Sequence, residues 1–298
     1  MKIRLVRGLL ALSARLPLRL NHLFGAWLGR LLLHTDNEQR RVAQTNLALC
    51  FPDLHPRQRH QLLKQSMIET GKAFFESGRL WLGEKKTVLD LVRAVHGEAH
   101  LQQALDTGKG VILAIPHLGN WEVIGLYCSS RYPMTSLYRP PRLAGLDALI
   151  RRARERFGAK LVPTTARGVR ALYQALANNE VVAILPDQDP RQSGGHFAPF
   201  FGVQAKTMTL LARLVNKSEA TVLSAYAERL PRGRGFAIHF EPAPPALYSS
   251  DLETALTALN QMVEQEVRRL PAQYQWGYKR FRSRPDSEPD LYRDADHG

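Results

Sequence analysis

Residues 111–125, VILAIPHLGNWEVIG, decide the fold. The apolar run 111–116 leads into His117 and a short turn, and Glu122 then stands at the start of a helical pattern. A buried strand that passes directly into a helix is the building unit of a parallel, helix-covered sheet. In open sheets of this kind, ligands bind beyond the carboxyl ends of the strands. The stretch therefore predicts the fold class and places His117 and Glu122 where a functional site is expected.

Short β-type runs recur along the chain, and helical patterns separate most of them. The expected strands are residues 111–116, 134–138, 160–163, 181–186, 221–226 and 236–241, and the expected helices among them are 121–130, 145–157, 167–178, 205–217 and 251–270. This alternation predicts an α/β fold with a mostly parallel central sheet flanked by helices. The PRGRG turn at 231–235 predicts that the last two strands are antiparallel. Residues 37–80 are expected to form two helices that meet at the FPDLHP break.

The first 33 residues predict a basic amphipathic helix, because a spacing of about 100° per residue separates an apolar face from a basic one. The apolar face holds Leu5, Leu9, Leu12, Leu16, Leu20, Leu23 and Trp27, and the basic face holds Arg4, Arg7 and Arg15. Arginines interrupt every apolar run well short of the roughly 20 residues of a spanning helix, and Pro17 predicts a kink or a division. Such a helix is typical of the interface of an anionic membrane. The alternative is that the Leu stripe packs on the protein's own core.

Composition narrows the class of protein and of partner. The 298 residues are 44% hydrophobic and 23% charged, which excludes a disordered chain and a multi-span membrane protein. A formal charge of +14 favours an anionic partner, such as nucleic acid, anionic lipid, a phosphorylated substrate or an acidic carrier protein. Cys50 and Cys128 indicate neither a disulfide framework nor a Cys metal site. The spacing of His96, Glu98 and His100 is not that of a zincin helix, so no metal is expected.

The pair His117 and Glu122 suggests a catalytic base. A carboxylate that converges on a His across a short turn fixes the tautomer of the ring, and the other ring nitrogen then removes a proton from a hydroxyl group. His-x4-Glu is by itself a weak signal, but its place after a strand strengthens it. Asn120 and the backbone N–H groups at the start of the following helix are candidates to stabilise an oxyanion.

Further polar residues follow other strands. Asp187 follows VVAILP as His117 follows VILAIP, so both are expected in one cleft, with Asp189 as the alternative carboxylate. Arg139 lies between a strand and two prolines, where it is placed to bind a phosphate or to polarise the site. The ordinary alternatives are a surface arginine and an Asp that caps a helix.

Several motifs together carry a resemblance to a known family. They are HLGNWE (117–122), LYRP (137–140), LPDQD (185–189), GGHFAPFFG (194–202) and QYQWGYKRFRSRP (273–285). In this order they resemble the late (secondary) acyltransferases of lipid A biosynthesis, of the lauroyl/myristoyl type, within the glycerolipid acyltransferase superfamily. That superfamily's signature is His-x4-Asp/Glu after a strand. The resemblance covers essentially the whole chain and implies a glycerol-3-phosphate acyltransferase-like fold.

The resemblance implies direct transfer of a fatty acyl chain from an acyl carrier protein thioester to a hydroxyl of a lipid A precursor. His117 and Glu122 would be catalytic, no cofactor or metal would be needed, and inner membrane lipids on the cytoplasmic side would be further partners. The substrate-binding candidates are Arg139, Asp187, Asn120 and Asp189. The chain also lacks a G-x-S-x-G nucleophile elbow. The implied organisation is a membrane-associating helix (1–34), an acyltransferase domain (35–284) and a flexible tail (285–298).

Other functions stay open at this level. Within the enzyme class, the alternative is an O-acyltransferase that acts on another glycolipid or glycerolipid. A basic nucleic-acid- or membrane-binding module would explain the charge but not the polar residues at strand ends, and no nucleic acid partner is expected. Of two basic groups, the first fits an acidic carrier protein, a phospholipid or lipid A phosphates, with a solvated helix face as the ordinary alternative, and the second fits headgroup contact or RNA stacking. They are Arg151, Arg152, Arg154 and Arg156, and Lys279, Arg280, Arg282 and Arg284 beside Trp276, Tyr278 and Phe281.

Overall fold

The computed structural model describes residues 2–141, 144–190, 194–286 and 288–293. Within them the main sheet has seven strands in the order β1-β9-β8-β2-β5-β3-β4. Their bounds are β1 (Val92–His96), β2 (Val111–Ala114), β3 (Met134–Tyr138), β4 (Ala159–Pro163), β5 (Val181–Ile184), β8 (Thr221–Arg229) and β9 (Phe236–Pro242). Strands β8, β2, β5, β3 and β4 run parallel to one another. Strand β9 is antiparallel to β8, and β1 is parallel to β9.

This sheet confirms the predicted α/β fold, all six expected strands and the antiparallel last pair. Strand β1 was not predicted. It is a short strand at the edge of the sheet, and none of its five residues is fully buried, so it has no apolar run. The helix expected over 205–217 is wrong in its first part. Residues up to Met208 belong to β7 (Val203–Met208), which forms a separate hairpin with β6 (Gly195–Phe200), and α10 (Leu210–Ser218) begins after it. The alternate residues Ala205 and Thr207 are buried, which is the period of a strand.

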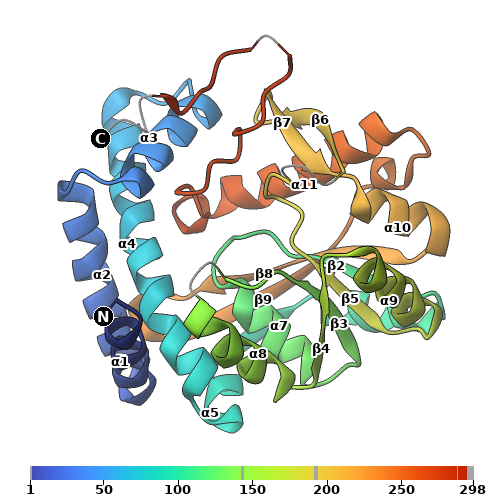
Figure 1. Ribbon diagram of the computed structural model, residues 1–298, viewed down its shortest axis with the longest axis horizontal. Helices are drawn as coiled ribbons and strands as arrows, with labels where there is room; N and C mark the ends of the chain where they lie inside the picture. Colours follow the sequence, from blue (N-terminus) through green and yellow to red (C-terminus); the bar gives the residue numbers. More distant parts are fainter. Residues whose placement is uncertain (1, 142–143, 191–193, 287, 294–298) are drawn as a thin grey trace.

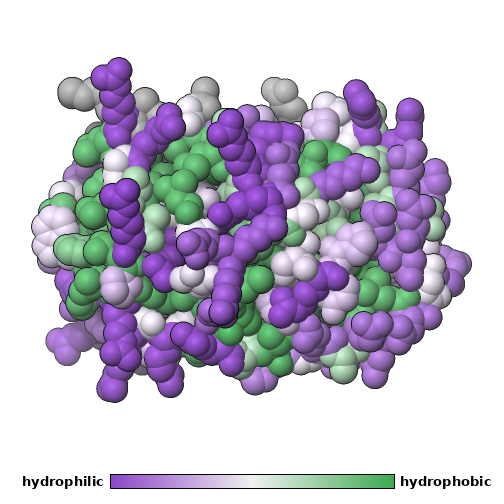
Figure 2. All heavy atoms as spheres, turned by 90° about the horizontal axis from the view of Figure 1, so that it is seen from below, coloured by the Kyte–Doolittle hydropathy of each residue, from purple (hydrophilic) through white to green (hydrophobic). Residues whose placement is uncertain are grey.

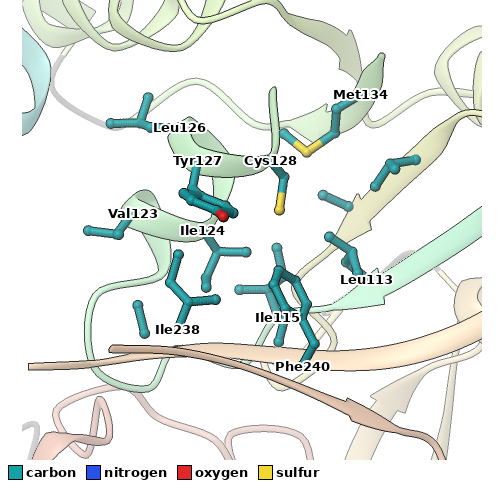
Figure 3. Close-up of a cluster of buried hydrophobic side chains, with 14 of the residues drawn as sticks. Leu113, Ile115, Val123, Ile124, Leu126, Tyr127, Cys128, Met134, Ile238 and Phe240 are labelled. Carbon is teal, nitrogen blue, oxygen red and sulfur yellow. The ribbon is translucent and has the colours of Figure 1, made fainter. Parts of the chain in front are cut away.

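Helices cover both faces of the sheet (Figure 1). One face carries α6 (Glu98–Asp106) and α7 (Trp121–Ser129), while the other carries α9 (Ala166–Ala177), α10 and α11 (Leu252–Arg269). In the first layer, Val123, Ile124 and Tyr127 of α7 meet apolar side chains of β2 and β9, including Leu113 and Phe240 (Figure 3). Both faces of β2 and β5 are therefore buried, which explains why these strands read as unbroken apolar runs. Helices α5 (Lys85–Leu89) and α8 (Asp147–Glu155) complete the periphery.

Four N-terminal helices stand at one end of the molecule (Figure 1). They are α1 (Lys2–Arg15), α2 (Leu18–His34), α3 (Glu38–Cys50) and α4 (Pro56–Leu82), and Pro17 divides the first two as predicted. Glycines hold α2 close to α4. A Cβ added at Gly29 would lie 2.2 Å from the Met67 carbonyl oxygen, and one at Gly71 would lie 2.1 Å from the Gly25 carbonyl oxygen. Among the residues that the structure describes, no helix is long and apolar enough to cross a membrane.

The predicted apolar stripe of α1 and α2 faces outward for most of its length. Its exposed members are Leu5, Leu12, Leu20, Leu23 and Trp27, with Leu23 and Trp27 about two thirds exposed at 65% and 64%. Leu9 and Leu16 are half-buried. The inward side of α2 is instead made of small and polar residues such as Gly25, Ala26 and Gly29. The stripe is therefore not the surface through which these helices pack on the core.

The C-terminal segment returns across the carboxyl ends of the strands. The Gly119 N–H donates to the Gln273 carbonyl at 3.0 Å, and the Gln275 N–H donates to the His117 carbonyl at 3.0 Å. Beyond it, Tyr292 is buried beside α3 and its hydroxyl donates to Asn46 Oδ1. This part of the predicted tail is thus packed, while residues 287 and 294–298 lie outside the described residues.

Candidate active site

The turn after β2, residues 117–120, has a fixed backbone. Gly119 adopts φ +62°, and a Cβ there would lie 1.9 Å from the Ala227 carbonyl oxygen, so this position requires glycine. The Asn120 N–H donates to that same carbonyl at 2.9 Å. With the two bonds to the C-terminal segment, β8 and residues 273–275 hold the turn from two sides. His117 therefore sits on a rigid scaffold and not on a loose loop.

His117 is bound by the carboxylate that follows the neighbouring strand. Its Nδ1 lies 2.8 Å from Asp187 Oδ1, and its backbone N–H donates to Asp187 Oδ2 at 2.8 Å. Burial works to raise the pKa of Asp187, but the charge of His117 and its hydrogen bonds outweigh it and hold the pKa below its usual range. A charged Asp187 keeps the ring proton on Nδ1, which leaves Nε2 with a free lone pair.

Two glutamines stand beside the second ring nitrogen. Gln188 Nε2 lies 3.1 Å from His117 Nε2 and 3.0 Å from Gln275 Oε1. An amide N–H can donate to an unprotonated imidazole nitrogen, so this contact agrees with a proton on Nδ1. The ring of Trp121 lies 4.8 Å from the His117 ring, centroid to centroid. Sequence reasoning missed both glutamines, although Gln188 lies inside the quoted LPDQD motif.

Glu122 lies elsewhere in the site than the sequence suggests. It is the second residue of α7, and its carboxylate accepts from Arg154 of α8, with Arg154 Nε at 3.1 Å from Oε2 and Nη2 bound to Oε1. In the described residues, the carboxylate that touches the His117 ring is Asp187. The reason is geometric: the first turn of α7 carries Glu122 toward α8, whereas Asp187 ends a strand parallel to β2 in the next sheet position. The matching runs VILAIPH and VVAILPD were the sequence signal for this pairing.

The remaining predicted residues differ in their surroundings. Arg139 is exposed at the end of β3. Asn120 is buried, and its amide nitrogen donates to Glu76 Oε2 at 2.7 Å. Asp189 is buried and its Oδ2 accepts from the Ser283 N–H at 2.9 Å, so it holds the C-terminal segment in place. Arg139 thus faces solvent, whereas Asn120 and Asp189 are engaged by the protein itself.

Buried thiols and metal-ligand types complete the inventory. Cys50 and Cys128 are buried, and burial raises the pKa of Cys128 to about 12. A thiol with so high a pKa stays protonated at neutral pH and is therefore a poor nucleophile. Within the described ranges, no group of three or more His, Cys, Asp or Glu residues is placed to hold a metal ion.

Comparison with known proteins identifies the family of the chain. The family model of bacterial lipid A biosynthesis acyltransferases matches residues 2–283. A lipid A biosynthesis acyltransferase of Haemophilus influenzae is 30% identical over 284 residues, which cover 95% of this chain and 88% of that protein. The lipid A biosynthesis lauroyltransferase of Escherichia coli is 26% identical, with coverage of 96% and 92%, and the palmitoleoyltransferase of the same organism is 28% identical, also with 96% and 92%. The chain therefore belongs to the family of bacterial lipid A biosynthesis acyltransferases and is an enzyme.

Proposed function

We propose that the protein transfers a fatty acyl chain from an acyl carrier protein thioester to a hydroxyl group of a lipid A precursor, with His117 as the general base. The observation that carries the proposal is the bond between His117 Nδ1 and Asp187 at 2.8 Å. It leaves Nε2 as the basic atom at the carboxyl edge of the sheet, where open α/β folds bind their ligands. The family membership supports lipid A as the acceptor.

The proposed chemistry is a direct transfer. Nε2 of His117 removes the acceptor's hydroxyl proton while that oxygen attacks the thioester carbonyl carbon, and the carbonyl opens to an oxyanion. The oxyanion then collapses, the C–S bond breaks, and the departing thiolate receives the proton from His117. Backbone N–H groups at the start of α7 are proposed to stabilise the oxyanion. Since Gln188 occupies Nε2 here, the acceptor hydroxyl has to displace its amide.

Glu122 keeps a place in this proposal through its ion pair with Arg154. Burial opposes the charge of Arg154, but Glu122 outweighs it and raises the pKa of Arg154 above its ordinary value. We propose that this pair fixes the first turn of α7 and thereby the oxyanion donors beside His117. Glu122 would then act with His117 as one unit without touching its ring.

The membrane part of the proposal rests on the outward face of α1 and α2. Exposed leucines and Trp27 stand on this face, and basic residues flank it, including Arg15, Arg19 and Arg30. A helix with apolar and basic sides binds the interface of an anionic bilayer. We propose that this face rests peripherally on the cytoplasmic side of the inner membrane, where carrier protein and lipid precursor meet.

A transfer assay tests the proposed function directly. Purified protein is given acyl carrier protein loaded with lauroyl, myristoyl or palmitoleoyl chains, and either a lipid A precursor or glycerol 3-phosphate as acceptor. Mass spectrometry should detect an added secondary acyl chain on the lipid A precursor. Preference for glycerol 3-phosphate would replace the acceptor that we propose. Equal transfer from His117→Ala protein would remove the base.

A further inference from the structure

A fully buried carboxylate lies behind the catalytic turn. Glu76 of α4 is 0% exposed, and every hydrogen bond that the structure gives its side chain comes from a donor on another element. His22 Nε2 lies 2.6 Å from Oε1, Asn120 Nδ2 lies 2.7 Å from Oε2, and Arg229 binds both oxygens, with Nη2 at 2.7 Å from Oε2. Burial alone would raise the pKa of Glu76, but Arg229 and His22 lower it to about 2. The group is therefore charged at all physiological pH values.

Arg229 of β8 is also buried and extends the same network. Its Nη1 lies 3.0 Å from Glu69 Oε2, and its Nη2 also donates to the Gly119 carbonyl at 3.3 Å. Burial works against the charge of Arg229, but Glu76 and Glu69 outweigh it and raise its pKa. The pair thus reaches the catalytic turn twice, at the Gly119 carbonyl and at the Asn120 amide.

These contacts are more than the packing of α4 requires. Replacing a buried ion pair by apolar residues of similar size is often neutral for stability, so such a pair is weak evidence of a stabilising role. Its directional bonds, in contrast, fix the position of whatever they contact. Here two of these bonds contact Gly119 and Asn120, which lie two and three residues after His117.

We infer that Glu76 and Arg229 are positioning residues that hold the turn 117–120 in its catalytic geometry, so that the helices α2 and α4 are part of the catalytic apparatus. The inference rests on the proposed role of His117. It also explains why Asn120 is turned toward α4: its amide is the link between the turn and Glu76. Through His22, the same carboxylate connects to α2, whose next residue Leu23 points outward.

The test compares two variants. One is expected to have the lower melting temperature and the other the lower kcat. Glu76→Gln leaves Arg229 buried with a weakened partner, whereas the double variant Glu76→Met with Arg229→Met removes both charges at similar volume. The double variant should therefore melt at or above the temperature of Glu76→Gln. If the pair positions the turn, the double variant should nonetheless have the lower kcat, because it loses the bonds from Arg229 to the Gly119 carbonyl and from the Asn120 amide to Glu76. We expect a loss of about 10²-fold, the usual cost of a misplaced catalytic group, with KM for donor and acceptor nearly unchanged.

A matched control is Leu172→Ala, since Leu172 is fully buried on α9 and packs in the core on the far face of the sheet. It should lower the melting temperature and leave kcat near the wild-type value. Activity that follows melting temperature across all three variants, or a wild-type kcat in Glu76→Gln and the double variant, overturns the inference. If the double variant does not fold, Glu76→Gln against Leu172→Ala still decides. His117→Ala separates the two ideas: if it stays active, the proposed base is wrong, whereas an inactive His117→Ala beside a fully active Glu76→Gln and a fully active double variant refutes only the positioning role.

Discussion

His117 presents two ring nitrogens with different partners, and this asymmetry determines what each substitution at the residue scale does. Among the residues that the structure describes, Nδ1 is held by a buried carboxylate, while Nε2 is contacted by an amide that a substrate can displace. In the proposed mechanism, removing the ring removes the base, whereas removing Asp187 leaves a base that is free to rotate and to change its tautomer.

His117→Ala should therefore lower kcat by about 10²–10⁴-fold, the usual contribution of a general base. Asp187→Asn should lower kcat in the same direction, and the double variant should be little worse than His117→Ala alone, because residues that act as a unit are strongly non-additive. Steady-state transfer rates of the single and double variants measure this. Multiplicative losses would mean that the two residues act independently. The same cycle with Glu122→Ala tests whether the Arg154 pair belongs to that unit.

Glu266 should make the stability of the protein depend on pH. It is buried on α11 and hydrogen-bonded by Ser224, and burial, with a smaller effect of Glu241 and Asp187, raises its pKa from 4.5 to about 8. Between these two values the folded state keeps a proton that the unfolded state has lost, so its stability falls as pH rises from 4.5 to 8. Melting curves of Glu266→Gln should show a gain over the wild type that grows across this window. A constant difference between the two proteins would contradict the assignment.

At the scale of elements, the local sequence pattern predicts individual strands and helices but not the contacts between distant ones. The strands β2 and β5 are buried on both faces and could be predicted as unbroken apolar runs, whereas α9 and α11 bury residues at helical spacing and could be predicted from that period. The similar sequences at the ends of β2 and β5, VILAIPH and VVAILPD, also predicted that His117 and Asp187 share a cleft. The pairing of Glu122 with Arg154 and of Glu76 with Arg229 could not be predicted, because it depends on how α8 and α4 dock and leaves no local pattern.

Two glycines predict opposite effects of one and the same substitution. Gly29 of α2 packs directly on the α4 backbone, where a Cβ would lie 2.2 Å from the Met67 carbonyl oxygen, whereas a Cβ at Gly8 of α1 meets nothing within 4 Å. Gly8→Ala should raise stability by about 0.5–1 kcal/mol through its higher helix propensity. Gly29→Ala should instead lower stability, since α2 must move away from α4. Chemical denaturation of both variants measures the difference, and a stabilised Gly29→Ala protein would show that the two helices are not in close contact.

At the scale of the whole molecule, hydrophobic and hydrophilic surface are interspersed. Seen from below, hydrophobic areas lie between long hydrophilic side chains, including at the end occupied by α1 and α2 (Figure 2). Deleting residues 1–33 would be a poor test of membrane contact, because α1 and α2 pack on α4 and their loss would uncover it. Substitutions on the outward face change the surface without changing this packing.

Leu23→Ser with Trp27→Ser should weaken binding to vesicles that contain phosphatidylglycerol, because both side chains are about two thirds exposed, at 65% and 64%. Leu82→Ser is the matched control, since Leu82 is 41% exposed but belongs to α4 and not to α2. Sedimentation with vesicles measures both, and binding of the wild type should fall as salt screens the formal charge of +14. Equal losses in the control and the double variant would remove α2 as the contact.

The strap formed by residues 273–275 also has a consequence for how the enzyme is made. Every strand of the sheet, His117 and Asp187 are translated before Gln273 and Gln275, yet these late residues hold the backbone at the His117 carbonyl and at the Gly119 N–H. A nascent chain could therefore form its sheet before it is able to transfer an acyl chain. A protein truncated after Ala272 should fold its sheet, as circular dichroism would report, and transfer no acyl chain. The order of synthesis would then delay activity, since the enzyme would become active only after residues 273–275 have left the ribosome.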